Sequence, residues 1–283
     1  MDRNVIDTDL SGKVAVVTGA GGVLCSEFSK ILARAGAKVA LLNRTVSKAQ
    51  KYADEINAAG GTAKAYECNV LDKKMCEATA ERVLKELGPC DILLNGAGGN
   101  NPSATTENDR YEPGDIDSSI RTFFNLEEDG IEAVFDLNFM GTLIPTQVFA
   151  LQMLGRSGCN IINISSMNAI TPLTRIPAYS GAKAAVNNFT QWLAVYFSRE
   201  GIRVNGIAPG FFSTAQNAKL LWNDDGTPTE RTEKILRATP MGRLGESREL
   251  SGTLLFLLNN EAASFVTGVT IPVDGGFSAY SGV

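Results

Sequence analysis

Residues 13–25, Lys-Val-Ala-Val-Val-Thr-Gly-Ala-Gly-Gly-Val-Leu-Cys, decide the fold of this chain. The run from Lys13 to Thr18 is short, apolar and rich in β-branched side chains, which is typical of a strand buried on both faces. The glycine-rich turn after it leads into helical spacing over Ser26–Ala35, and Gly36 ends that helix. A buried strand that passes through such a turn into a helix indicates an α/β fold.

The same alternation of strand and helix continues to the end of the chain. Further strands are predicted at Lys38–Leu42, Ala63–Cys68, Asp91–Leu94, Asn160–Ile164, Ile202–Ala208 and Thr270–Val273. Helices are predicted between them at Val46–Ala59, Lys73–Leu87, Glu132–Leu154, Ala178–Arg199 and Leu250–Leu258. This order predicts a single doubly wound parallel sheet, a Rossmann fold, with helices on both faces and one domain over residues 1–283.

Two long polar segments interrupt the alternation, at about residues 100–130 and 211–249. Loops of this length inside a compact domain are usually functional. Each follows the carboxyl end of a strand, the edge at which doubly wound sheets bind their ligands. We expect the first segment to cover the site or to contact another subunit, and the second to form the substrate loop.

Composition excludes several classes of protein. The chain has 26 basic and 31 acidic residues, a net charge of −5, which argues against a nucleic-acid partner. It has no histidine, which excludes Ser-His-Asp hydrolases and the common zinc sites, and no metal site is predicted. Its five cysteines form no C-x-x-C pair and are interpreted as reduced thiols. Without a signal peptide or an apolar run of about 18 residues, we expect a cytoplasmic protein with no membrane segment.

The glycine-rich turn is a candidate phosphate site. Backbone N–H groups at the start of a helix can approach a pyrophosphate when glycines leave room for it. The residues in question are Thr18, Gly19, Gly21, Gly22, Val23 and Leu24. Tight packing alone would also explain the glycines, so the turn by itself leaves both interpretations open.

Joined to three later motifs, the turn resembles the short-chain dehydrogenase/reductase family. The matching residues are Thr18-Gly19, then Asn95-Gly96-Ala97-Gly98, then Tyr179-x-x-x-Lys183 with Ser165-Ser166 upstream, and Pro209-Gly210-x-x-x-Thr214. The family pattern T-G-x-x-x-G-x-G has Val23 and Cys25 at its two later glycine positions here. Gly21 and Gly22 are expected to allow the close approach of the backbone to the pyrophosphate instead.

The resemblance implies a catalytic set of four residues, Asn138, Ser166, Tyr179 and Lys183. Without histidine, a tyrosine can move the proton if a nearby cation lowers its pKa. Tyr179 and Lys183 are four residues apart and share one helix face. The resemblance then implies that Ser166 binds the substrate carbonyl and Tyr179 transfers the proton. Lys183 would bind the nicotinamide ribose, and Asn138 would support a proton-relay water.

A nicotinamide dinucleotide is the cofactor that the resemblance implies. Its contacts would include Asn69 and Val70 beside the adenine, Asn95, Gly96, Ala97 and Gly98 after the fourth strand, Tyr179 and Lys183, and Pro209, Gly210 and Thr214 at the nicotinamide amide. Asn43 stands where an acid would select NAD, and the Arg44 guanidinium suits a 2′-phosphate. NADP is therefore predicted, with NAD as the alternative in which Arg44 stacks on adenine or faces water.

Within the family, the chain resembles sugar-acid reductases, above all D-mannonate oxidoreductases (fructuronate reductases), with gluconate 5-dehydrogenases next. The stretches that carry this likeness include NGAGGN at 95–100, NISSMN at 163–168 and the ending IPVDGGFSAYSGV. The predicted substrate contacts are Ser166, Asn168, Arg175, Tyr179 and Gln216, with Asn100, Asn101 and Asn217 nearby. Arg175 is favoured as the cation for a substrate carboxylate, although a surface or inter-subunit role is equally open.

Other functions stay open at this point. The same chemistry could act on an acyl or steroid ketone, although the polar Asn-rich rim argues against an apolar substrate. A non-catalytic nucleotide sensor on the same fold is the alternative of a different class. The apolar stripe of the helix after Tyr179 and the C-terminal tail resemble surfaces that form family tetramers, so a homotetramer is expected. Core packing would also explain the stripe.

Overall fold

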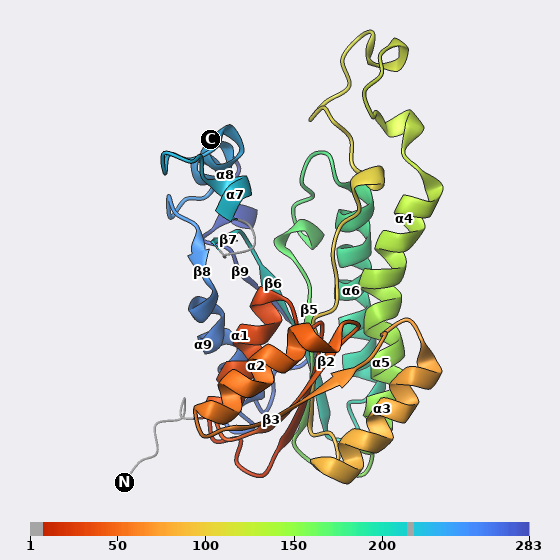
Figure 1. Ribbon diagram of the computed structural model, residues 1–283, viewed down its shortest axis with the longest axis vertical. Coiled ribbons are helices and arrows are strands. Elements are labelled where there is room, and N and C mark those ends of the chain that lie inside the picture. The colour runs from red at the N-terminus through yellow and green to blue at the C-terminus, as the bar shows by residue number, and fades with distance from the viewer. Residues whose placement is uncertain (1–7, 214–217, 283) are drawn as a thin grey trace.

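A seven-stranded parallel sheet organises the chain (Figure 1). The computed structural model describes residues 8–213 and 218–282. The strands are β1 (Val14–Thr18), β2 (Lys38–Asn43), β3 (Thr62–Glu67), β4 (Ile92–Asn95), β5 (Cys159–Ile164), β6 (Ile202–Pro209) and β9 (Thr270–Val273). They lie in the order β3-β2-β1-β4-β5-β6-β9, and every neighbouring pair is parallel. The predicted doubly wound fold is confirmed.

Helices cover both faces of this sheet. On one face lie α1 (Val23–Arg34), α2 (Val46–Ala58) and α9 (Ser251–Leu258). On the other lie α3 (Lys73–Glu86), α5 (Gly141–Phe149) and α6 (Pro177–Tyr196). Successive strand residues point to opposite faces, so that Val17 joins the first core cluster and Val16 the second. Burial on both faces explains why β1 is an almost uninterrupted apolar run, whereas the edge strand β3 mixes buried and exposed residues.

The helix predicted over Glu132–Leu154 begins earlier and contains an irregular turn. It runs through α4 (Glu128–Phe135), a π-helical turn (Asp136–Met140), α5 and a final 3₁₀ turn (Ala150–Gln152). By length and composition this 25-residue helix could cross a membrane, but half of its most apolar window is buried inside the fold. A core helix of a soluble protein passes the same test, so the helix is weak evidence for a membrane span.

The ligand-binding edge of the sheet is set where the strand order reverses, between β1 and β4. The connections that leave these two strands run to opposite faces of the sheet, which opens a crevice at their carboxyl ends. Thr18 ties the two ends together, because its Oγ1 accepts hydrogen bonds from the N–H groups of Gly96 (3.0 Å) and Ala97 (3.2 Å). Two segments that are 78 residues apart in sequence therefore form the floor of the crevice.

Two projections rise above this edge (Figure 1). One is the insertion at 100–130, built of three 3₁₀ turns (Pro102–Ala104, Asp115–Asp117 and Phe123–Asn125). The other contains β7 (Phe212–Ser213), α7 (Ala218–Leu221), α8 (Glu230–Ala238) and β8 (Gly245–Glu246). No sequence pattern predicted β7 and β8, because two-residue strands carry no periodicity.

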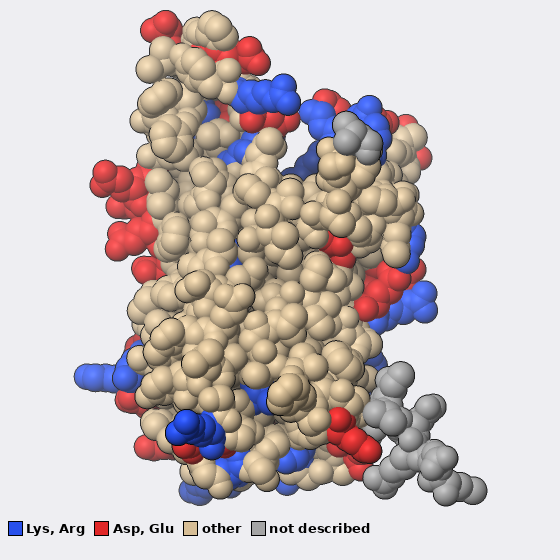
Figure 2. Space-filling model, turned by 180° about the vertical axis from the view of Figure 1, so that it is seen from behind, with Lys and Arg blue, Asp and Glu red and all other residues tan. Residues whose placement is uncertain are grey.

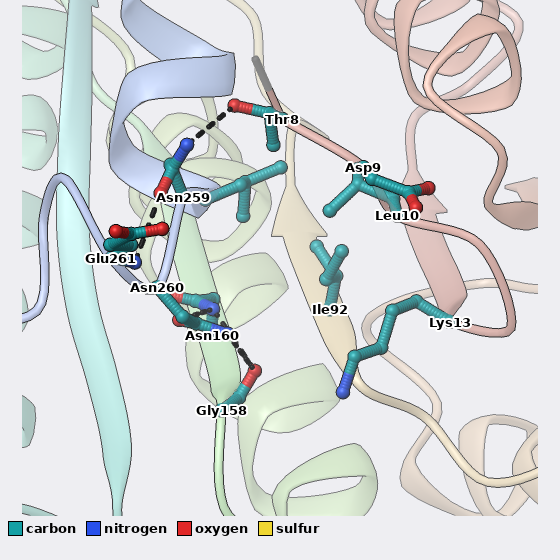
Figure 3. A pocket seen from close by; sticks show the side chains of 11 residues that line it. Thr8, Asp9, Leu10, Lys13, Ile92, Gly158, Asn160, Asn259, Asn260 and Glu261 are labelled. Atoms are coloured by element: carbon teal, nitrogen blue, oxygen red, sulfur yellow. Dashed lines mark hydrogen bonds between the residues drawn. The ribbon is translucent and has the colours of Figure 1, made fainter. Parts of the chain in front are cut away.

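A cavity of about 180 Å³ lies at the opposite, amino-terminal edge of the sheet (Figure 3). Lys13, Ile92 and Asn160 line it where β1, β4 and β5 begin, and Asn259 and Glu261 close its other side. None of the predicted catalytic residues lines this cavity. We therefore place the candidate reaction site at the carboxyl edge.

Candidate active site

The predicted catalytic serine and tyrosine meet at the carboxyl end of β5. Ser166 begins the 3₁₀ turn Met167–Ala169, and its Oγ accepts a hydrogen bond from the Asn168 N–H (3.2 Å). Tyr179 lies in the first turn of α6, which Pro177 opens at a position that needs no backbone N–H. The Tyr179 side chain forms a hydrogen bond with Ser166. Two hydroxyl groups thus lie side by side where a carbonyl oxygen can accept from both.

Lys183 lies one helical turn beyond Tyr179 and is buried, with only 4% of it exposed. Its Nζ donates to the Ile164 carbonyl (2.8 Å) and lies 5.7 Å from the centre of the Tyr179 ring. A Cβ at Gly98 would be 3.1 Å from this Nζ, so the glycine leaves the ammonium group room. Burial lowers the pKa of Lys183 to about 8.

The pKa of Tyr179 differs from the sequence-based expectation. Burial raises it above its ordinary value, and the opposing effect comes from the Ser166 hydrogen bond. We expected Lys183 to lower this pKa. In the structure the Lys183 ammonium donates to the Ile164 carbonyl, and burial lowers the pKa of Lys183 itself. The expected lowering of the Tyr179 pKa by Lys183 is therefore not seen.

Asn138 is fully buried in the π-helical turn of the long helix. Its Oδ1 accepts from the Gly99 N–H (3.2 Å), and its Nδ2 donates to the carbonyls of Gly99 (2.7 Å) and Val134 (2.7 Å). The side chain therefore clamps the loop that leaves β4 against the helix. Such π turns occur frequently at functional sites. The turn brings Asn138 to the same loop as Lys183, at Gly98.

The glycine-rich turn forms a close cradle. Gly19 has a positive φ of 65°, and a Cβ there would be 2.9 Å from the Ala97 backbone. Gly22 is the N-cap of α1, whose first turn, starting with Val23 and Leu24, has no acidic residue. The positive end of a helix dipole without a nearby carboxylate favours a bound anion. The residues present therefore fit a dinucleotide pyrophosphate.

Cys25 stands where the family pattern has a glycine, and the structure shows how it is accommodated. The side chain is buried, and its Sγ contacts the Gly96 carbonyl at 3.5 Å. A Cβ at Gly96 would collide with this sulfur. The departure from the family pattern is thus compensated by packing beneath the turn.

Two basic residues, Arg44 directly after β2 and Lys48 in α2, lie near the outer side of the cradle. Asn43 accepts from the Gly21 N–H (3.3 Å) and donates to the Thr45 carbonyl (2.9 Å), while Arg44 is exposed. A Cβ at Gly21 would lie 2.8 Å from the Cβ of Lys48, in the first turn of α2. Sequence reasoning missed Lys48. Its place five residues after Asn43, at a helix start beside the turn, was the available signal.

The remaining predicted cofactor residues fall into two groups. Val70 is buried, and the Asn69 Oδ1 accepts from the Leu71 N–H (3.2 Å), which shapes the loop after β3. Asn95 lies within the sheet, where its Nδ2 donates to Thr146 and Asn163 (both 2.9 Å), so its side chain ties strand to helix.

On the far side of the crevice, the Pro209-Gly210 segment packs against the C-terminal region. A Cβ at Gly210 would lie 2.6 Å from the Asp274 Cα, so a glycine is required there. A cavity of about 370 Å³, lined in part by Phe211, Met241 and Asp274, adjoins it. Thr214, Gln216 and Asn217, which the sequence assigned to cofactor or substrate, lie outside the described residues.

The predicted substrate residues are placed unevenly. Asn168 is buried beside Ser166, and its Oδ1 has no hydrogen-bond partner among the described residues. Arg175 is exposed, has a positive φ of 72°, and donates from Nε to the Thr106 carbonyl (2.9 Å). Asn100 and Asn101 bond within the insertion, to Thr105 and to Ser103 respectively.

The fold and these motifs define a dinucleotide-binding oxidoreductase. Residues 13–224 match the family model described as "short chain dehydrogenase". The chain belongs to the short chain dehydrogenase family, and the enzyme class predicted from the sequence is confirmed as an NAD(P)-dependent oxidoreductase. Among the described residues, no group of three or more Cys, Asp or Glu side chains is arranged to hold a metal ion.

Similar proteins cover almost the whole chain. An uncharacterized oxidoreductase of Haemophilus influenzae is 58% identical over 97% of this chain and 96% of its own length. A solved structure from that organism, provisionally described as a D-mannonate oxidoreductase with bound NAD, is also 58% identical, with a TM-score of 0.94 over 99% of each chain. The gluconate 5-dehydrogenase of Gluconobacter oxydans is 32% identical over 95% of this chain and 96% of its own.

Proposed function

We propose that this enzyme reduces a keto sugar acid, D-fructuronate to D-mannonate, and also runs the reverse reaction. The observation that carries the proposal is the pair of hydroxyls on Ser166 and Tyr179, with the buried Lys183 ammonium one helical turn away. A nucleotide sensor would need no such donor pair. The likeness to a relative provisionally described as a D-mannonate oxidoreductase supports the choice of substrate.

The proposed mechanism follows from the site residues. Bound NAD(P)H supplies the hydride. The Ser166 and Tyr179 hydroxyls hold the carbonyl oxygen, and Tyr179 gives its proton to that oxygen as negative charge develops there. Burial keeps Tyr179 protonated and therefore able to donate. Lys183 would hold ribose hydroxyls of the cofactor, and Asn138 fixes the Gly98–Gly99 loop beside it.

Substrate contacts would come from the polar residues around this pair. The unpartnered Oδ1 of Asn168 is buried beside Ser166, as a group waiting for a hydroxyl donor would be. A buried unsatisfied oxygen costs about 1–3 kcal/mol, which a bound polyol would recover. We propose Arg175 for the substrate carboxylate, because this exposed cation lies between Ser166 and Tyr179 in the sequence. Gln216 is proposed as a further contact.

For the cofactor, we propose that both NADPH and NADH are accepted. Asn43 carries no charge to repel a 2′-phosphate, and Arg44 and Lys48 are both exposed beside the turn. The relative from Haemophilus influenzae binds NAD. Arg44 and Lys48 would then add affinity for NADPH without being needed for NADH.

We propose that the enzyme is a cytoplasmic homotetramer. Phe189, Trp192 and Tyr196 form a stacked aromatic row along α6, and Trp192 and Tyr196 are more than half exposed. An exposed apolar row of this kind is typical of an interface between subunits. Sedimentation of the purified protein tests the assembly.

The cysteines support the proposed cytoplasmic location, because free, buried thiols suit a reducing compartment.

The experiment that tests the reaction follows reduced-nicotinamide absorbance with each cofactor and a panel of ketones. D-fructuronate is expected to give the highest kcat/KM, ahead of 5-ketogluconate, D-tagaturonate and a 7-ketosteroid. Preference for 5-ketogluconate would support a gluconate 5-dehydrogenase instead. Binding of NADH without turnover of any ketone would reject the enzyme assignment and favour a sensor.

A further inference from the structure

The insertion at 100–130 differs in charge from the rest of the molecule. It contains eight acidic residues and two basic ones, whereas the whole chain has a net charge of only −5. Its charge of −6 therefore exceeds that of the whole chain. The insertion rises as a separate projection from the sheet edge, opposite the projection that carries α8 (Figure 1).

Hydrogen bonds join the two ends of the loop at the base of the insertion. The Glu107 N–H donates to the Arg121 carbonyl (2.8 Å), and the Arg121 N–H donates to the Glu107 carboxylate (2.9 Å). Arg121 also donates through Nη1 to the Pro102 carbonyl (2.9 Å). Residues 107–121 thus form a loop with a fixed base.

The insertion is joined to the segment that precedes Tyr179. Thr106 and Arg175 exchange two hydrogen bonds of 2.9 Å, from the Thr106 N–H to the Arg175 carbonyl and from the Arg175 Nε to the Thr106 carbonyl. Thr174 donates to Asp109 Oδ1 (3.3 Å). Arg175 keeps its left-handed backbone, an unfavourable conformation for a side chain of this size, within these contacts.

Asp109 also reaches the other projection. Its Oδ2 lies 3.8 Å from the Nζ of Lys234 on α8, and Lys234 pairs with Glu230 one turn earlier at 3.1 Å. Figure 2 shows an opening between the two projections, with basic and acidic side chains meeting above it. Asp109 is thus the residue at which the Thr174 segment, the insertion and α8 come together.

We propose that Asp109 and Lys234 close a strap over the mouth of the substrate cleft and thereby limit the size of the substrate. This rests on the proposed reaction at Ser166 and Tyr179. The strap joins the segment that leads to Tyr179 with the α8 projection, and it lies at the opening between the two projections (Figure 2). Both members of the ion pair are about half exposed, so the pair is weak and can break and re-form during turnover.

The first test compares two conservative variants by hydrogen exchange. Asp109→Asn removes the bridging charge, and Glu230→Gln removes the other partner of Lys234 without touching the strap. We expect Asp109→Asn to raise exchange at least threefold in both 105–121 and 230–238, with Glu230→Gln changing only 230–238. Equal exchange patterns in the two variants would overturn the strap. This readout needs no substrate, so it stands even if the substrate assignment fails.

The second test measures selectivity. For Asp109→Asn, the kcat/KM for a bulky ketone such as a 7-ketosteroid, relative to D-fructuronate, is expected to rise at least threefold. Glu230→Gln should leave that ratio unchanged. Charge reversal sharpens the result: Asp109→Lys and Lys234→Asp should each raise the ratio, and the double variant should restore it. The reversal is made in the Glu230→Gln background, because Lys234→Asp puts a second carboxylate beside Glu230. Absence of restoration would reject the ion pair as the closure.

Discussion

The proposed cofactor side and the proposed substrate side of this crevice are built in different ways. On the cofactor side, contacts are made by backbone groups and glycines at the ends of regular strands, as where Thr18 ties Gly96 and Ala97 to β1. On the proposed substrate side, contacts are made by side chains of segments that are far apart in the sequence, as where Asp109 of the insertion meets Thr174 and Lys234 of α8. The first is fixed by the fold, whereas the second depends on individual side chains and can change without altering the sheet.

The largest expected effect lies where the two sides meet, at Tyr179. Tyr179→Phe removes the proposed proton donor and keeps the ring. We expect kcat to fall by about 10³-fold or more, because a positioned acid contributes about 10²–10⁴-fold. Dinucleotide binding, followed by nicotinamide fluorescence, should change less than twofold. A variant that keeps a tenth of the activity would show that another group donates the proton.

Lys183 offers the next largest effect, with opposite signs for activity and stability. Lys183→Met should lower kcat by about 10²-fold. The folded pKa of about 8 lies below the ordinary 10.5, so the unfolded chain binds more protons and wild-type stability rises as the pH goes from 8 to 10.5. Burying the ammonium below pH 8 therefore costs on the order of 3 kcal/mol.

Unfolding by urea at two pH values measures this difference. The variant should be more stable than the wild type at pH 7, by an amount that the loss of the hydrogen bond to Ile164 reduces. This difference in stability should disappear near pH 10.5. Thr190→Val, one of the buried positions further along α6, serves as a control whose effect should not depend on pH. A variant destabilised equally at both pH values would show that burial of the Lys183 charge does not lower the stability of the wild type.

The contrast between the two sides also explains what the sequence could predict. Buried strands and helix faces are periodic, so the sheet and most of its helices were predicted within a few residues. The Ser166, Tyr179 and Lys183 cluster was predicted from the resemblance of these motifs and their spacing to the short-chain dehydrogenase family. The π turn at Asn138 and the contacts of Asp109 arise from tertiary packing. No local pattern encodes those.

The cofactor side can be tested at its outer edge. Arg44→Ala and Lys48→Ala should each raise the KM for NADPH about tenfold and leave the KM for NADH within twofold, because only NADPH carries the 2′-phosphate. The double variant should accept NADH alone. Parallel steady-state kinetics with the two cofactors measure this. A similar loss for both cofactors would mean that these side chains contact the adenine or shape the turn.

The smallest effect is expected at Arg175, where the backbone and the guanidinium can be separated. Arg175→Ala keeps the strain of a side chain at φ 72° and removes the Nε bond to the Thr106 carbonyl, whereas Arg175→Gly removes both the strain and that bond. The glycine variant should therefore be the more stable of the two by about 1 kcal/mol. If the guanidinium binds the substrate carboxylate, both variants should raise the KM for a keto acid far more than for its neutral analogue. Equal changes for acid and neutral analogue would limit Arg175 to holding the insertion, and the carboxylate would then be bound by another cation.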